Sequence, residues 1–247
     1  MGLRHVLFRS AARSFAVRTL LGTINERLKR AFFSFDAGKY ALPLLANPFT
    51  SRRQCAIWSD KADVYEYEPG ASGSKGDAIF SQALAMIEGR VGRNDLVFDI
   101  GCNSGYFLGR FHDAGYVRLA GLDPQKRAIE HLNRHRPYIR SFLGFFGEVE
   151  HGLEADLVTF FSSIDRIPYS ARLFDAIAAC ARKYVMIVTP EFGENFKRDW
   201  HFEMARIGFM CIEKRVLDAA LAPVGVSSSA DFASESLSFF LFRRIET

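Results

Sequence analysis

Two Asp residues and a turn of small residues are spaced in this chain as in a cofactor-binding site. Residues 97–105 read Val-Phe-Asp-Ile-Gly-Cys-Asn-Ser-Gly, and Asp123 stands 18 positions after Gly105, within Gly-Leu-Asp-Pro. The order is a short apolar strand, a tight turn, a helix and a second strand that ends in a carboxylate. This order predicts a βαβ unit that forms a pocket for an adenosine-containing cofactor.

The glycine spacing separates two kinds of adenosine site. A nicotinamide site requires G-x-G-x-x-G, and this chain has Asn103 and Tyr106 where the second and third glycines would stand. The order Asp99, Gly101, Asn103, Gly105 resembles instead the acid-x-G-x-G-x-G turn of the class I S-adenosylmethionine (SAM)-dependent methyltransferases. Asn replaces the middle glycine, which is tolerable because Asn adopts left-handed backbone conformations more readily than most residues.

The resemblance covers about residues 75–244 and implies SAM as the cofactor. Gly101 and Gly105 would let the backbone approach the methionine part of SAM, and Asp99 would hold its ammonium group or bond the turn amides. Asp123 would accept both ribose hydroxyls; as an alternative that can coexist, it is an N-cap with Pro124 at the first helical position. The further cofactor contacts expected from the turn and the strand ends are Cys102, Asn103, Pro124, Glu148, Phe161 and Ser162, with Glu148 expected at the adenine amino group.

Three residues are candidates for general acid–base catalysis on the group that accepts the methyl. Asp165 and Arg166 stand before Ile-Pro, where many small-molecule methyltransferases have a His-His pair. Asp165 would act as general base or orient the substrate, and a salt-bridged loop is the structural alternative. His151 and Glu191 also follow expected strands closely enough to reach the pocket. An acid-acid-Asn pattern for a divalent cation is not seen, so we expect transfer without a metal.

The periodicity predicts an α/β fold with a doubly wound, mostly parallel seven-stranded sheet and a terminal antiparallel hairpin. Alternating apolar strands and amphipathic helices run from residue 75 to the end of the chain, after a helical N-terminal extension. The expected strands are 95–100, 117–122, 140–146, 156–161, 184–189, 209–216 and 236–243. The expected helices are 75–90, one after the turn that runs through about Ala114, one from Pro124, 170–181 and 197–207.

The N-terminal segment differs in charge from the rest of the chain. Residues 1–35 contain seven basic residues and one acid, a net charge of 7 − 1 = +6, and the remainder has 25 basic and 27 acidic residues, a net charge of −2. We therefore expect two parts: a basic helical extension and linker over 1–74, and a SAM-binding domain over 75–247. The extension would pack on the domain, lie on an anionic membrane or a partner, or serve as a cleavable organelle-targeting peptide.

Composition and resemblance together predict the activity. We expect transfer of a methyl group by in-line displacement to a hydroxyl, or an amine, of a small molecule or glycan. RNA, such as tRNA, is the alternative acceptor, less favoured because the expected domain is not basic. A methyltransferase-like binding protein without turnover is a further alternative.

The cysteines and the hydropathy of the chain predict its location. Four cysteines without C-x-x-C spacing, and no apolar run long enough to span a bilayer, predict a cytoplasmic protein.

Overall fold

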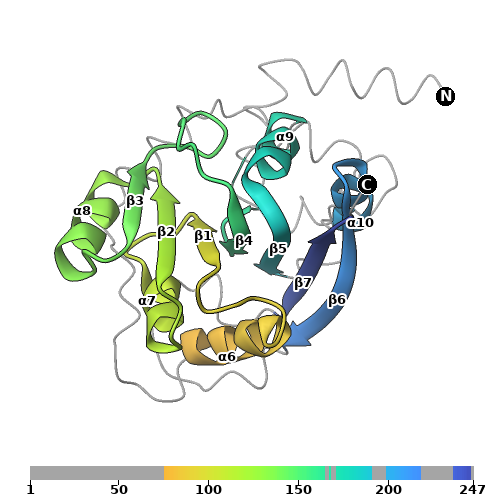
Figure 1. The fold of residues 1–247 in the computed structure, drawn as a ribbon, viewed down its shortest axis with the longest axis horizontal. Coiled ribbons are helices and arrows are strands. Elements are labelled where there is room, and N and C mark those ends of the chain that lie inside the picture. Colours follow the sequence, from red (N-terminus) through yellow and green to blue (C-terminus); the bar gives the residue numbers. More distant parts are fainter. Residues whose placement is uncertain (1–74, 165–166, 168–170, 191–198, 218–235, 246–247) are drawn as a thin grey trace, which may run out of the picture.

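The computed structural model describes residues 75–164, 167, 171–190, 199–217 and 236–245. The expected extension over 1–74, Asp165 and Glu191 lie outside these residues. The described part contains five helices and seven strands (Figure 1). The helices are α6 (Lys75–Ile87), α7 (Tyr106–Asp113), α8 (Lys126–His135), α9 (Ala171–Cys180) and α10 (Trp200–Arg206). The strands are β1 (Leu96–Ile100), β2 (Arg118–Asp123), β3 (Arg140–Leu143), β4 (Ala155–Phe161), β5 (Ala181–Pro190), β6 (Phe209–Leu217) and β7 (Leu237–Arg244).

The seven strands form one sheet in the order β3-β2-β1-β4-β5-β7-β6. The first five strands in this order are parallel, and β7 lies antiparallel between β5 and β6. This confirms the expected fold class, a mostly parallel seven-stranded sheet that ends in an antiparallel hairpin. The order reverses between β1 and β4, so the carboxyl ends of these two strands border the crevice where ligands bind in open α/β sheets.

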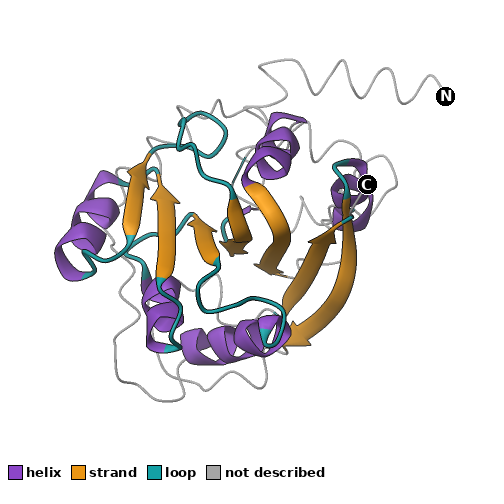
Figure 2. Ribbon diagram, in the orientation of Figure 1, coloured by secondary structure: helices purple, strands orange, loops and turns teal. Residues whose placement is uncertain are grey.

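Helices cover both faces of the sheet, which gives three layers (Figure 2). One face packs against α6, α7 and α8 through a core that includes Phe111 and Leu132. The opposite face packs against α9 and α10 through Phe174, Trp200 and neighbouring residues. Strands buried on both faces read as continuous apolar runs, as β4 does with seven buried residues.

The connection from β3 to β4 contains no helix, although α/β sheets usually have one there. The loop over 144–154 covers the sheet face with side chains of its own, among them Phe146 and His151. β3 ends at Leu143, three residues earlier than the sequence predicts. The chain leaves the strand at Gly144, whose φ of 146° favours glycine.

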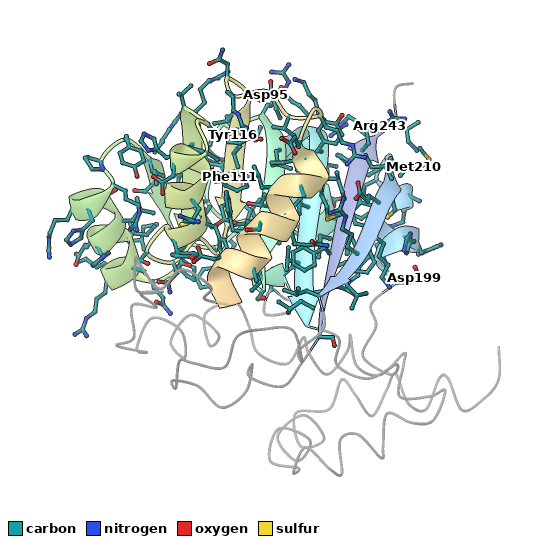
Figure 3. The ribbon with its side chains drawn as sticks, turned by 90° about the horizontal axis from the view of Figure 1, so that it is seen from below. Asp95, Phe111, Tyr116, Asp199, Met210 and Arg243 are labelled. Atoms are coloured by element: carbon teal, nitrogen blue, oxygen red, sulfur yellow. The ribbon has the colours of Figure 1, made fainter. Side chains whose placement is uncertain are left out.

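Ion pairs hold three strands together at the amino end of the sheet. The Lys183 ammonium at the start of β5 lies 3.0 Å from Asp95 and 3.1 Å from the Asp156 carboxylate on β4. Asp156 also accepts a hydrogen bond from the backbone amide of Leu96 on β1. Asp95 lies at this edge in Figure 3, while Asp199, the N-cap of α10, lies at the opposite edge. Because Asp156 is buried and paired, we assign this end of the sheet a structural role.

Candidate cofactor site

The turn between β1 and α7 has three residues in the left-handed conformation. The φ angles are 77° at Gly101, 48° at Asn103 and 79° at Gly105. The backbone amides of Gly101 and Cys102 both donate to the carbonyl of Leu122 on β2. The prediction that Asn103 takes the place of a glycine with positive φ is therefore confirmed.

Close packing explains why two of these positions are glycine. A Cβ atom at Gly101 would lie 2.5 Å from the Cβ of Ser163, which follows β4. A Cβ atom at Gly105 would lie 2.8 Å from Leu132 Cδ1 on α8. Real Cβ atoms do not approach other carbons this closely, so each glycine allows a neighbouring element to reach the turn.

Asp123 ends β2 with a buried carboxylate that is held by two backbone amides. Its Oδ2 accepts from Asn103 N at 2.9 Å, and its Oδ1 accepts from Gln125 N at 2.8 Å. Burial raises the pKa of Asp123 to about 6, while these two amides act in the opposite direction. Each oxygen keeps a second acceptor site, so the carboxylate can also receive the two hydroxyls of a ribose.

The sequence offered a second role for Asp123, that of N-cap with Pro124 at the first helical position. The structure corrects this role: the N-cap of α8 is Gln125, and the helix begins at Lys126. The Asp123 carboxylate bonds the amide of Asn103 and the amide of the N-cap residue Gln125, which precedes the helix. Pro124 is half-buried between the strand and the helix.

Asp99 lies one residue before the end of β1 and is 1% exposed. Its Oδ1 accepts a hydrogen bond of 2.8 Å from the Thr159 hydroxyl on β4. Burial raises the pKa of Asp99 to about 8, the Thr159 hydroxyl lowers it, and the nearby Asp123 raises it further. Two buried carboxyl groups with raised pKa values, near the carboxyl ends of the neighbouring strands β1 and β2, favour a cationic ligand.

Cys102 contributes to this site by packing. Its thiol fills the space above Gly121 on β2, where a Cβ atom would lie 2.6 Å from the sulfur. Burial, Asp123 and Asp99 all raise the pKa of the Cys102 thiol well above its ordinary range. The thiol therefore stays protonated, and it donates to the carbonyl of Asn103 within the turn at 3.6 Å.

The other expected cofactor contacts lie at strand ends but differ in what they touch. Phe161 stacks on Phe107 of α7 with ring centroids 4.0 Å apart and is buried in the core. Ser162 has a φ of 52° and donates its amide to Val188 O of β5. Glu148 is exposed in the loop after β3. Their roles toward a cofactor stay predictions.

The structure does not bring His151 to the carboxyl ends of the strands. Its ring packs edge-on against Phe98 in the middle of β1, with centroids 4.9 Å apart. Its Nδ1 accepts from the amide of Leu153, and burial together with Arg140 lowers the pKa of the imidazole. The neutral ring completes the aromatic cover of this sheet face, and its catalytic role stays a prediction.

Three residues near the turn were not found by the sequence reasoning. Gln125 is buried, and its Oε1 accepts from Asn103 Nδ2 at 3.4 Å. Ser163 donates its hydroxyl to the carbonyl of Ile100, and Thr159 bonds Asp99. Thr159 and Ser163 form hydrogen bonds with residues of the neighbouring strand β1. The residue pattern along a single strand does not predict such a pair. Gln125 stands two residues after Asp123, so the sequence motif that contains Asp123 could have pointed to it.

Metal ligands and membrane spans can be tested only on the described residues. Within this part of the chain, no three His, Cys, Asp or Glu side chains gather as a metal site would need. No helix there is long and apolar enough to cross a membrane.

Comparison with known proteins identifies the kind of fold and family. A family model described as a methyltransferase domain matches residues 78–216. Among solved structures, a candidate RNA methyltransferase from Pyrococcus horikoshii is similar, with a TM-score of 0.57, 12% identity, and coverage of 79% of this chain and 98% of that one. The StiE O-MT domain is similar with a TM-score of 0.56, 13% identity, and coverage of 71% and 83%. No curated protein sequence matches the chain.

Proposed function

This chain belongs to the class I SAM-dependent methyltransferase family, and from that premise we propose that it methylates a hydroxyl, or an amine, of a small molecule or glycan. The observation that supports the proposal is the pair of buried carboxyl groups, Asp99 and Asp123, beside a turn with three left-handed residues. The pair suits a molecule that has a cationic end and a ribose.

The residues at the turn fit SAM in their chemistry. Asp123 offers acceptor oxygens for the ribose hydroxyls, and its two backbone hydrogen bonds fix their direction. Asp99 offers a carboxyl group for the ammonium of the methionine part. When bound, SAM supplies an electrophilic methyl group on a sulfonium, so the protein has mainly to align the acceptor and exclude water.

Three acids or bases stay candidates for removing the acceptor proton. Asp165 and Glu191 lie outside the described residues, and His151 packs on the sheet face. A general base would add a factor of about 10²–10⁴ to the rate. Substitution of Asp165 by Asn and of Glu191 by Gln, with kcat measured for each variant, tests these two roles directly.

Charge favours a small or uncharged acceptor over a nucleic acid. Residues 36–247 have 25 basic and 27 acidic side chains, so they lack the excess of positive charge that binding to phosphates requires. RNA is the alternative acceptor, and its methylation would depend on the basic segment over 1–35.

Radiolabelled SAM provides the experiment. The full chain is incubated with labelled SAM and a lysate from its own source, with and without nuclease treatment. We expect label in the small-molecule or glycan fraction, and this label should survive nuclease treatment and disappear in Asp123→Ala. Label confined to RNA would overturn the acceptor proposal. Tight SAM binding without transfer to any fraction would favour a binding protein instead.

A further inference from the structure

Asp99 has a role in the proposed function, but its buried hydrogen-bond partner Thr159 has none. The two residues lie directly opposite each other on the parallel strands β1 and β4, at the point where the strand order reverses. The Thr159 hydroxyl lies 2.8 Å from Asp99 Oδ1, and Thr159 is fully buried. Branching at Cβ restricts the χ1 angle of Thr159, and the hydrogen bond to Asp99 directs its hydroxyl.

Among the described residues, one oxygen of the Asp99 carboxyl group accepts no hydrogen bond. Within the described part of the chain, the Thr159 hydroxyl supplies the only hydrogen bond to the Asp99 side chain, and it goes to Oδ1. Oδ2 is therefore the oxygen that a ligand can use. If Thr159 lost its hydroxyl, the carboxyl group would be free to rotate, and Oδ2 would lose its fixed direction.

The charges around the pair select the kind of ligand. The titratable group that acts on Asp99 is Asp123, and the titratable groups that act on the neighbouring Cys102 thiol are Asp123 and Asp99, so none of them brings a positive charge. A ligand group with a positive charge would be attracted, and a neutral one would gain little.

We propose that Thr159 is a positioning residue that fixes Asp99 for the amino group of the cofactor, so that the methionine part is recognised separately from the adenosine part. The proposal rests on the SAM site proposed above. The roles of Asp99 toward the amino group and of Asp123 toward the ribose come from the proposed function, and the new element is the Thr159 hydroxyl that orients Asp99.

Three ligands and three variants test this assignment by calorimetry. SAM and S-adenosylhomocysteine both contain the amino group, and 5′-methylthioadenosine contains the adenosine part without it. We expect Thr159→Val, which keeps the shape and removes the hydroxyl, to weaken SAM and S-adenosylhomocysteine about tenfold, the equivalent of one hydrogen bond. Methylthioadenosine should bind Thr159→Val as it binds the wild type. Thr159→Ser keeps the hydroxyl and should restore the wild-type pattern, and Asp123→Asn should weaken all three ligands.

A pH series adds a measurement that loss of packing alone would not change. Because the pKa of Asp99 is about 8, SAM affinity of the wild type should rise as the pH is raised toward that value. In Thr159→Val the rise should move to higher pH, because the hydroxyl lowers the pKa of Asp99.

The outcomes separate this inference from the proposed function. If the wild type binds none of the three ligands, the SAM site itself is wrong. If the wild type binds SAM but Thr159→Val weakens methylthioadenosine as much as SAM, the hydroxyl supports the turn and the inference is overturned. If Thr159→Val is unstable, Thr159→Ser provides the test instead. This variant keeps the hydroxyl, so a changed ratio of SAM affinity to methylthioadenosine affinity would contradict the proposal.

Discussion

Replacing Asp99 by Asn should make the free protein more stable and its cofactor binding weaker. The pKa of Asp99 is about 8 in the folded protein, against 3.8 for an ordinary Asp side chain. Between these two values the unfolded chain has this group ionised while the folded protein keeps it protonated, so the free energy of unfolding falls as the pH rises. Asn is neutral at every pH and has nearly the same shape, so the variant escapes this loss.

The size of the effect follows from the pKa difference. The stability advantage of Asp99→Asn should grow with pH by up to ~1.4 kcal/mol per unit, for one proton. Summed from about pH 4 to pH 7 this gives an upper limit of ~4 kcal/mol, and water penetration and local rearrangement reduce the penalty of a buried charge. We expect about 2 kcal/mol at neutral pH, or a Tm higher by about 4–8 °C.

Thermal and urea unfolding of the wild type and Asp99→Asn, measured from pH 5 to pH 7.5 without ligand, provide the assay. Addition of SAM should raise the Tm of the wild type and have much less effect on the variant, because only ligand bound to the folded state stabilises it. A variant less stable than the wild type, or a stability difference that stays constant with pH, would refute the burial argument for Asp99.

Substitutions at three further positions test the turn and the amino end of the sheet. Gly101→Ala should abolish SAM binding and lower stability by about 2 kcal/mol or more, since the new Cβ would lie 2.5 Å from Ser163 Cβ at a φ of 77°, and calorimetry with unfolding checks both. Asn103→Gly should keep SAM binding within about threefold while Asn103→Val loses it, because a φ of 48° disfavours β-branched residues; unchanged affinity in Asn103→Val would contradict this. Lys183→Met should lower the urea midpoint, because the buried Asp156 loses an ion pair, and should leave the Kd for SAM unchanged; a weaker Kd would mean that the two edges are coupled.

The order of strands and helices could be predicted because it depends on local patterns. Glycine, proline and apolar periodicity identified each described helix and strand, and the Asp99–Gly105 turn with Asp123 predicts where the cofactor binds. The end of β3 was wrong by three residues because the apolar run Phe145-Phe146 continues after the strand and packs from a loop.

The finer chemistry of the site depends on contacts between separate segments. The N-cap of α8 was misplaced because Asp123 bonds the amide of Asn103, 20 positions earlier in the chain. Thr159 was missed for the same reason, since only the register of β1 with β4 brings it to Asp99. A residue's neighbour across a parallel sheet is fixed by the whole fold, and the sequence around either residue contains no sign of it.

The position of β7 determines when the sheet can be completed during protein synthesis. β7 pairs with β5 on one side and with β6 on the other, although it follows both in the chain. Until the ribosome has released β7, β6 has no partner strand and β5 exposes an unsatisfied edge to other nascent chains. We expect the nascent polypeptide to need chaperone protection at this stage, and truncations upstream of residue 237 to aggregate.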